Sequence, residues 1–435
     1  MHTFETHESQ VRGYIRSWPT VFTKAEGHTL TDEGGRTYLD FFAGAGALNY
    51  GHNNPAIIEP LVDYLRSMGP LHALDMGTTA KRTFIERFVE VVLEPRGLDY
   101  KLQFTGPTGT NAVEAALKLA RKVTGRDSII SFTNAFHGMT LGSLAVTGNS
   151  MKRGGAGVPL NNSVPMPYAG FLGDENDSID YMDRFLLDDG SGVDLPAAVI
   201  LETVQAEGGV NVASERWLRR LFEVCQSHDI MVIVDDIQVG CGRTGAFFSF
   251  EELGLRPDLV CLSKSLSGSG LPFALLLMRP DLDIWEPGEH NGTFRGNNAA
   301  FVTATAALDN YWRTDELSCD VARKGDQLRV GLEGLAKQHD ELFEDVRGRG
   351  MIRGISCRVP ELASAITGAA FQRGLVIETA GPRGEVVKLL PPLVVSEPAI
   401  EQAFEMLGDA VQEVADTVAP ELLASLPDDI EEVVA

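Results

Sequence analysis

Cysteine is scarce in this sequence, with five residues spread over a chain of 435. None forms a CxxC pair or stands near a histidine at the spacing of a metal site: Cys225, Cys241, Cys261, Cys319 and Cys357. This pattern argues against a disulfide framework and against a Cys/His metal centre, and it favours reduced thiols in the cytosol. We therefore expect no metal site.

Apolar runs long enough to cross a membrane are also absent. No uninterrupted run reaches the roughly 18 residues of a spanning helix, and the first residues, MHTFETHESQVRGYIRSWP, lack the apolar region of a secretory signal. The hydrophobic fraction of 44% is ordinary for a globular protein and supplies material for a large core. The length predicts two or three domains.

Basic side chains are outnumbered, with 37 Lys and Arg against 61 Asp and Glu, and a net charge of −24. Only ten of the basic residues are lysines. Nucleic acids and anionic membranes need a basic face on their partner, so this balance argues against both. These exclusions together predict a cytoplasmic enzyme.

The middle of the chain alternates short, continuously apolar runs with amphipathic segments. A helix is predicted after the first run, because Val113, Ala116, Leu117 and Ala120 recur at helical spacing, and another over 214–228. Strands buried on both faces are typical of a mainly parallel sheet covered by helices. The predicted strands are 101–106, 128–132, 197–203, 230–236, 258–264 and 271–278.

The two ends of the chain predict a smaller α+β domain beside this α/β domain. A hairpin is expected over 28–42, with its turn at Glu33-Gly34-Gly35. The carboxyl-terminal part predicts helices over 320–340 and 397–418, and strands over 351–359 and 386–393. We expect the small domain to combine 1–60 with 316–435, which ends in an acidic tail, and the large domain to span 61–315.

Residues 105–114, TGPTGTNAVE, join a predicted strand to a predicted helix. Small residues let the backbone approach a ligand, and the free N–H groups of a helix start attract an anion such as phosphate. Asn111 and Glu114 resemble a capping pair, so a capped turn without a ligand is the alternative. The segment matches neither GxGxxG nor GxxxxGK[ST], which disfavours dinucleotide and Walker-type sites.

Two charged residues follow apolar strands, where ligands of α/β sheets bind. Asp235 ends one strand, and it could serve there as a ligand-binding carboxylate or only as a helix cap. Lys264 directly follows the next strand and precedes a Ser/Gly run; it could be a desolvated nucleophile or a lysine that reaches solvent. A phosphate cradle, a carboxylate and a buried lysine are together the groups that pyridoxal phosphate requires.

The chain resembles the class III aminotransferases of pyridoxal-phosphate fold type I over roughly residues 20–415. The motifs that carry the resemblance occur in a fixed order: TGTNAVEAALKLAR (108–121), FHGMT (136–140), ETVQAEGG (202–209), DDIQVGCGRTG (235–245) and LSKSLSGS (262–269). The resemblance implies that Lys264 forms the imine with pyridoxal phosphate and moves the proton. It also implies that Asp235 pairs with the ring nitrogen and that Gln238 contacts the ring hydroxyl.

The resemblance assigns the remaining cofactor contacts as well. Gly109 and Thr110 would hold the phosphate, while Phe136 would stack on the ring with His137 beside it. Each of the last two could instead be an ordinary core residue. Thr293 would reach the phosphate of a neighbouring subunit, so the resemblance implies a homo-oligomer, at least a dimer with a shared active site.

Substrate recognition departs from the usual pattern of this family. Glu207 matches a glutamate that pairs with an arginine in the ω-aminotransferases, but this chain has Lys388 at the position of that arginine. A lysine supplies the charge without the bidentate grip on a carboxylate. Met139 stands where some relatives have an arginine, so recognition of an ordinary GABA-like carboxylate is not expected.

Further segments resemble the L-2,4-diaminobutyrate–2-oxoglutarate aminotransferases of ectoine biosynthesis: 42–55, 71–81, 290–298 and 386–393. That subfamily implies amino transfer between L-glutamate and L-aspartate 4-semialdehyde. An ornithine- or GABA-type aminotransferase is an alternative, as is a decarboxylase, racemase or aminomutase on the same scaffold. A regulatory protein that binds the cofactor without catalysis is disfavoured, because Lys264, Asp235 and the phosphate loop are all present.

Overall fold

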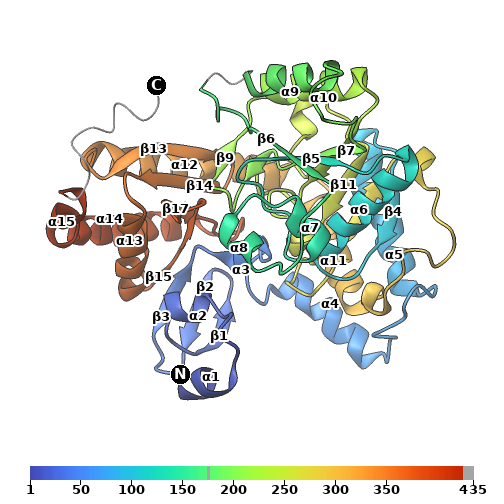
Figure 1. The fold of residues 1–435 in the computed structure, drawn as a ribbon. Helices are drawn as coiled ribbons and strands as arrows, with labels where there is room; N and C mark the ends of the chain where they lie inside the picture. Colours follow the sequence, from blue (N-terminus) through green and yellow to red (C-terminus); the bar gives the residue numbers. More distant parts are fainter. Residues whose placement is uncertain (174–176, 425–435) are drawn as a thin grey trace.

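The computed structural model describes residues 1–173 and 177–424. The acidic tail expected at the carboxyl end, with Pro427, Asp428, Asp429, Glu431 and Glu432, lies outside the described residues. Figure 1 shows a central sheet flanked by helices, with segments from both ends of the chain beside it.

The central sheet has seven strands in the order β4-β12-β11-β10-β7-β5-β6. The apolar runs predicted from the sequence supply six of them, and β6 is the seventh. The sheet is mainly parallel, as expected, but β12 runs antiparallel to both of its neighbours. The bounds are β4 (Lys101–Phe104), β5 (Ile129–Phe132), β6 (Ser163–Met166), β7 (Ala198–Leu201), β10 (Met231–Asp235), β11 (Leu259–Leu262) and β12 (Leu275–Met278).

Successive residues of each strand face opposite sides of this sheet, and both sides are buried. Ile233 packs into a cluster with helix α6, whereas Val232 and Val234 pack into a second cluster with α5, α10 and α11. Each such side chain contributes roughly 1.5–3 kcal/mol by its burial. The helices of the large α/β part are α4 (Pro55–Arg66), α5 (Thr79–Phe88), α6 (Gly109–Thr124), α7 (Leu141–Ala145), α8 (Ser150–Gly154), α9 (Asp177–Leu187), α10 (Glu215–Ser227) and α11 (Asn298–Tyr311).

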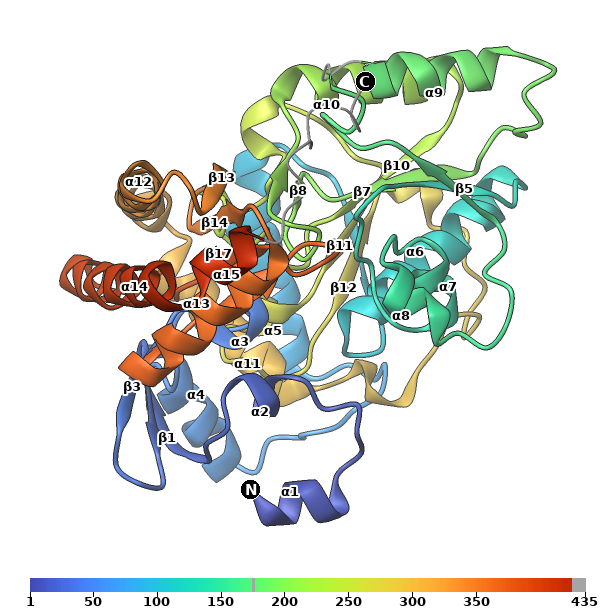
Figure 2. The same cartoon turned by 60° about the vertical axis from the view of Figure 1, so that its left-hand side comes forward.

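Strands from the two ends of the chain form two smaller sheets. The predicted hairpin is present as β2 and β3, and β3 also pairs in parallel with β15 from the carboxyl-terminal part. Figures 1 and 2 both place these amino-terminal strands near the carboxyl-terminal helices. The amino-terminal elements are α1 (His2–His7), α2 (Tyr14–Ser17), β1 (Phe22–Glu26), β2 (Thr29–Asp32), β3 (Thr37–Asp40) and α3 (Ala43–Gly46).

The second small sheet has the order β13-β14-β17-β16 and is covered by the carboxyl-terminal helices. The helices predicted over 320–340 and 397–418 correspond to α12 and α14, and the predicted strands to β14 and β17. The elements are α12 (Glu316–Gln338), β13 (Phe343–Arg349), β14 (Ile352–Cys357), α13 (Pro360–Arg373), β15 (Leu375–Val376), β16 (Glu378–Ala380), β17 (Val386–Leu389), α14 (Glu397–Thr417) and α15 (Ala419–Leu423).

Short elements complete the chain. A two-stranded ribbon of β8 (Val204–Gln205) and β9 (Asn211–Val212) follows β7. One π-helical turn, η1 (Val89–Leu93), extends α5. The 3₁₀ turns are η2 (Glu94–Arg96), η3 (Glu251–Leu253), η4 (Lys264–Ser267), η5 (Pro280–Leu282) and η6 (Thr293–Arg295).

Arg243 joins the loop after β10 to both ends of the chain. Its guanidinium is fully buried and donates to the carbonyl oxygens of Met351 and Pro391, at 2.9 and 2.5 Å, and to Asn49 Oδ1 at 2.7 Å. Burial lowers the pKa of Arg243 to about 9. The three acceptors are buried with it, so they depend on this one planar donor.

We expect Arg243→Lys to lower the free energy of unfolding by roughly 2–4 kcal/mol, because an ammonium cannot reach all three acceptors and leaves buried oxygens without a donor. Urea denaturation measures the change. The matched control is Arg329→Lys, which alters an exposed ion pair with Glu333 and should cost less than about 1 kcal/mol. Equal effects of the two substitutions would contradict this role for Arg243.

Candidate active site

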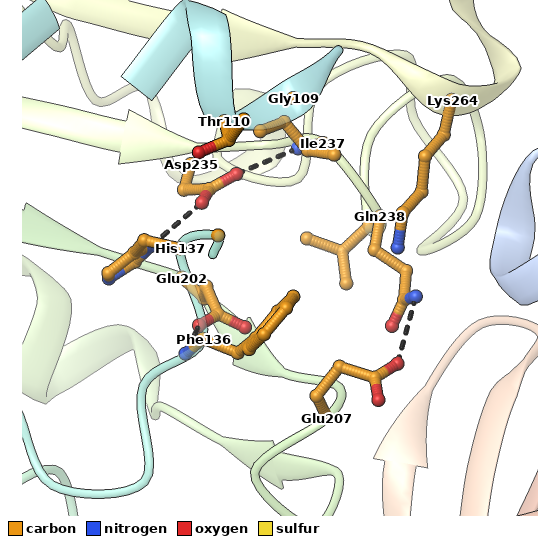
Figure 3. Close-up of a pocket in the computed structure, with 12 residues that line it drawn as sticks. Gly109, Thr110, Phe136, His137, Glu202, Glu207, Asp235, Ile237, Gln238 and Lys264 are labelled. Carbon is orange, nitrogen blue, oxygen red and sulfur yellow. Dashed lines mark hydrogen bonds and ion pairs between the residues drawn. The ribbon is translucent and has the colours of Figure 1, made fainter. Parts of the chain in front are cut away.

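A cavity of about 170 Å³ lies at the edge of the central sheet where the parallel strands end (Figure 3). Polar residues at or just after the ends of β5, β7, β10 and β11 line it, together with Glu207 of the β8–β9 turn and the start of α6. The lining residues are Gly109, Thr110, Phe136, His137, Gly138, Glu202, Glu207, Asp235, Ile237, Gln238, Val239 and Lys264. This edge is where ligands bind in α/β sheets.

Asp235 and Lys264 meet here because their strands are neighbours. Asp235 is the last residue of β10 and lies opposite Cys261 of β11. Lys264 begins η4 just after β11, so it lies close to Asp235 in the fold. Lys264 has a φ of +49°, a left-handed conformation that is strained for a residue with a side chain. Figure 3 shows its amine projecting toward the cavity beside Gln238.

The amine of Lys264 lines the cavity near other charged side chains. No hydrogen bond or ion pair holds this amine among the described residues, and the residue is partly exposed. Burial lowers the pKa of Lys264; Lys388 adds to this effect, while the charge of Glu207 opposes it. A lowered pKa increases the fraction of neutral amine, which is the nucleophilic form.

Asp235 is held by contacts on both carboxylate oxygens. Its Oδ2 lies 2.7 Å from His137 Nδ1, and its Oδ1 accepts a 3.2 Å bond from the Ile237 amide. Burial alone would lower the pKa of His137, but the hydrogen bond and the charge of Asp235 outweigh it and raise the pKa. The other ring nitrogen of His137 is buried without a partner among the described residues.

The start of α6 forms a cradle with free N–H groups. The Thr108 hydroxyl does not cap the helix but donates to Asn111 Oδ1 at 2.8 Å. A Cβ on Gly109 would lie 2.9 Å from Ile237 Cδ1, and one on Gly138 would lie 2.5 Å from Thr110 Oγ1. Only small residues therefore leave this cradle open to an anion.

The expected capping role of Glu114 is wrong. Glu114 does not reach back to the start of its own helix but across to the start of α7. There its Oε1 accepts bonds from the amides of Gly142 and Ser143 at 2.9 and 3.1 Å, and from the Thr140 hydroxyl at 2.6 Å. The tertiary fold brings α7 within reach, which local spacing cannot show.

Phe136 lines the cavity and is fixed through its backbone. Its N–H donates to Glu202 Oε1 at 2.8 Å, and the amine of Lys152 lies 4.1 Å from its ring centre. Figure 3 shows the aromatic ring projecting into the space between Glu202 and Glu207. Phe136 and His137 thus face the same cavity as Asp235, although both could have been ordinary core residues.

Gln238, Glu207 and Lys388 form a chain of contacts at the other side of the cavity. Gln238 Nε2 donates to the Ala45 carbonyl at 2.8 Å and to Glu207 Oε1 at 3.1 Å, while its own Oε1 is buried without a partner among the described residues. Lys388 does not line the cavity; it lies behind Glu207 and contacts Glu207 Oε1 at 2.9 Å. Although burial opposes it, the charges of Lys388 and Lys264 lower the pKa of Glu207 to about 2.

Two expected site residues, Lys388 and Thr293, do not line this cavity. Of these, Thr293 also has no contact, within the described part of the chain, with a residue that does. It is exposed on η6, and its carbonyl oxygen lies 2.7 Å from His72 Nε2. No other member of the expected set is apart from the site, since Lys388 joins it through Glu207.

Comparisons with known proteins decide the family. The model of the family described as "Aminotransferase class-III" matches residues 13–411. The chain belongs to the class III aminotransferases.

Relatives within this family are similar over almost the full chain. A diaminobutyrate–2-oxoglutarate transaminase from Oceanobacillus iheyensis is 55% identical over 412 residues, 95% of this chain and 96% of the relative. One of the same name from Nocardia farcinica is 56% identical over 413 residues, 95% of this chain and 94% of the relative.

Solved structures agree with the fold of this aminotransferase. The ornithine aminotransferase from Toxoplasma gondii superimposes with a TM-score of 0.81 at 25% identity, covering 95% of this chain and 94% of that one. An aminotransferase from Bacillus anthracis gives a TM-score of 0.84 at 23% identity, covering 95% and 97%. The α/β fold with a large sheet and flanking helices is thereby confirmed.

The cofactor of this family, pyridoxal phosphate, fits the residues of the cavity. It needs an amine, a carboxylate near the ring nitrogen and an anchored phosphate. The aminotransferase has an unpaired amine facing the cavity, a carboxylate fixed from two sides, and a helix start with free amides. The unpartnered His137 Nε2 and Gln238 Oε1 provide further polar contacts that the chain itself leaves unused.

Glu202 is a site residue that the sequence analysis missed. It immediately follows β7, so the strand-end argument that found Asp235 could have found it too. Burial raises the pKa of Glu202 to about 7, although the facing His137 opposes this shift. In the described ranges, no group of three or more His, Cys, Asp or Glu side chains could hold a metal ion. No described helix is both long and apolar enough to cross a membrane.

The raised pKa of Glu202 predicts a pH dependence of stability. Because the pKa is about 7 in the folded protein and 4.5 ordinarily, the folded state binds more protons than the unfolded chain between these values. The free energy of unfolding should therefore fall, relative to Glu202→Gln, by up to about 3 kcal/mol as pH rises from 5 to 8.

Urea denaturation of cofactor-free protein across this pH range measures the difference. The exposed Glu215→Gln serves as the control and should show no such trend. A constant difference between wild type and Glu202→Gln over the whole range would contradict the raised pKa.

Proposed function

We propose that this aminotransferase moves an amino group between L-glutamate and L-aspartate 4-semialdehyde, giving 2-oxoglutarate and L-2,4-diaminobutyrate, a precursor of ectoine. The name shared by the relatives at about 55% identity supports this substrate pair. The structural observation that carries the proposal is the Glu207–Lys388 pair beside the Lys264 amine. The pair provides both a positive and a negative contact for the charged groups at the end of the substrate that lies away from the reacting amine.

When bound, pyridoxal phosphate accepts the electron pair released from the substrate C–H bond. In the proposed mechanism, Lys264 would hold the cofactor covalently until the substrate amine replaces it there. The freed Lys264 amine would then take the proton from the substrate carbon and return it on the cofactor side. Asp235, fixed by His137, would keep the ring nitrogen protonated, and Gly109 and Thr110 would hold the phosphate at the start of α6.

The remaining residues orient the ring and the substrate. Phe136 would cover one face of the ring, and Gln238 would contact its hydroxyl. Glu207 and Lys388 read the far end of the substrate. With diaminobutyrate, Glu207 stays on Lys388 and faces the α-ammonium group. With glutamate, the substrate carboxylate takes the place of Glu207 on Lys388.

We propose that the chain divides into a large domain of residues 61–315 and a small domain built from 1–60 and 316–435. The pairing of β3 with β15 supports a small domain made from both ends. Residue 60 lies inside α4, which packs on α11, so this boundary crosses a helix. We also propose a cytoplasmic location, which the five free cysteines support.

An absorbance screen of amine donors tests the substrate proposal. The reconstituted enzyme should shift from its pyridoxal to its pyridoxamine spectrum with L-2,4-diaminobutyrate and with L-glutamate. Ornithine and GABA should react at least about tenfold more slowly. Ornithine places its α-ammonium group one methylene farther from the reacting amine, and GABA has no α-ammonium group to face Glu207. Lys264→Ala should show no shift with any amine.

A shift with ornithine or GABA but none with diaminobutyrate would reject the substrate pair. Turnover of diaminobutyrate without any keto acid would instead point to a decarboxylase, racemase or aminomutase.

We further propose that the active unit is at least a dimer in which Thr293 reaches the phosphate of the neighbouring subunit. Its exposure outside its own cavity supports this, as do two exposed apolar side chains: Phe294, its neighbour in the chain, and Leu71, which adjoins the His72 that contacts Thr293. Light scattering should give a mass at least twice that of one chain. In the same preparation, Thr293→Ala should weaken cofactor retention about tenfold through loss of a phosphate contact. A monomer with full activity would contradict the proposal.

A further inference from the structure

Lys388 has a second acidic partner, Glu378, that the sequence analysis did not identify. The Lys388 ammonium lies 2.9 Å from Glu207 Oε1 and also 2.9 Å from Glu378 Oε1. The Lys388 side chain is 0% exposed and that of Glu378 is 5% exposed, whereas that of Glu207, which borders the cavity, is 20% exposed. One buried cation therefore faces two carboxylates, of which only one is within reach of a substrate.

Glu378 is anchored by the sheet. It stands directly opposite Lys388 in the antiparallel register of β16 and β17, so the backbone ladder fixes the distance between the two side chains. The hydroxyl of Tyr14 donates to Glu378 Oε2 at 3.3 Å. Tyr14 is itself held by ring contacts with Trp18 and Phe42.

Glu207 has a weaker anchorage. It lies in the turn between β8 and β9, outside any strand, and its carboxylate is held through side-chain bonds from Lys388 and Gln238. These bonds can break without disturbing a backbone ladder. The two acids thus differ in freedom: Glu378 is fixed beside Lys388, and Glu207 can move.

Charge balance explains why two acids are needed. An ammonium buried without a counter-ion costs several kcal/mol. If Glu207 were the sole counter-ion of Lys388, each movement of Glu207 away from Lys388 would leave the buried ammonium without a counter-ion. With Glu378 in place, Lys388 keeps one counter-ion, and the N–H that Glu207 releases becomes free for another carboxylate.

We propose that Glu378 is the permanent counter-ion of Lys388 and that it allows Glu207 to exchange with a substrate carboxylate. This inference rests on the proposed function for the identity of that substrate, L-glutamate. Glu378 is a positioning residue, since it acts through Lys388 and does not line the cavity. The pairing of both acids with Lys388 can be tested without any substrate.

A stability cycle tests the charge balance. We expect Glu207→Gln and Glu378→Gln each to lower the Tm of the purified enzyme only slightly, because each retains one counter-ion. The double variant should lose roughly 4 °C or more beyond the sum of the two single losses. Adding Lys388→Met to the double variant should recover most of this excess, because it removes the buried charge.

The control for the Glu→Gln change is Glu333→Gln at an exposed ion pair, which should leave the Tm unchanged within about 1 °C. Additive losses in the cycle would overturn the proposal, as would a single variant that fails to fold.

The two half-reactions test the exchange itself. With one counter-ion left, Lys388 should hold Glu207 more firmly in Glu378→Gln. The absorbance change with L-glutamate should therefore lose about tenfold or more in kcat/KM, mainly through KM, while the change with L-2,4-diaminobutyrate should lose less than about threefold. Equal losses with both amines, or no loss with glutamate, would overturn the proposal.

An error in the proposed substrate pair would be distinguished from an error in the proposed role of Glu378. If the substrate pair is wrong, the wild-type enzyme would not react with diaminobutyrate at all, while the Tm of the double variant would still fall by more than the sum of the single losses.

Discussion

Charge buried at the carboxyl edge of the central sheet is the constraint on which the rest of the structure depends. Asp235 is held by His137, and Lys388 is balanced by carboxylates, so these charges have fixed partners in the protein. The amine of Lys264 is the exception, because it faces the cavity and no hydrogen bond or ion pair holds it among the described residues. An amine kept in this state is available to react with a bound aldehyde.

The scaffold holds this arrangement in place at some cost in strain. Lys264 adopts a left-handed backbone conformation, and so does Cys241 in the loop after β10. That loop also carries Arg243, whose buried guanidinium ties it to Met351, just before β14, and to Pro391, just after β17. Strained residues persist only where their surroundings determine their conformation, and here the surroundings combine both ends of the chain.

Six of the seven strands of the central sheet could be predicted from the sequence, and so could the position of Asp235 and Lys264 at its edge. Buried strands are continuously apolar, and Asp235 and Lys264 stand out because they directly follow such strands. The direction of β12 was not predictable, because a strand buried on both faces has the same pattern whether it runs parallel or antiparallel. Glu202 could have been found by the argument used for Asp235.

Contacts that depend on the tertiary structure could not be predicted from the sequence. Glu114 caps α7 and not its own helix, because the fold places the two helix starts together. Glu378 faces Lys388 only through the register of β16 and β17, and no local pattern gives that register. The proposed role of Thr293 depends on a second chain, which one sequence does not place.

Lys264 is the amine proposed to join the cofactor. Reduction of the reconstituted enzyme with borohydride, followed by peptide mass analysis, distinguishes it from the other lysines among the ten of the chain. The pyridoxyl-phosphate mass should be attached to the peptide that contains Lys264. Attachment at another lysine, or the absence of any attached mass, would contradict the proposal.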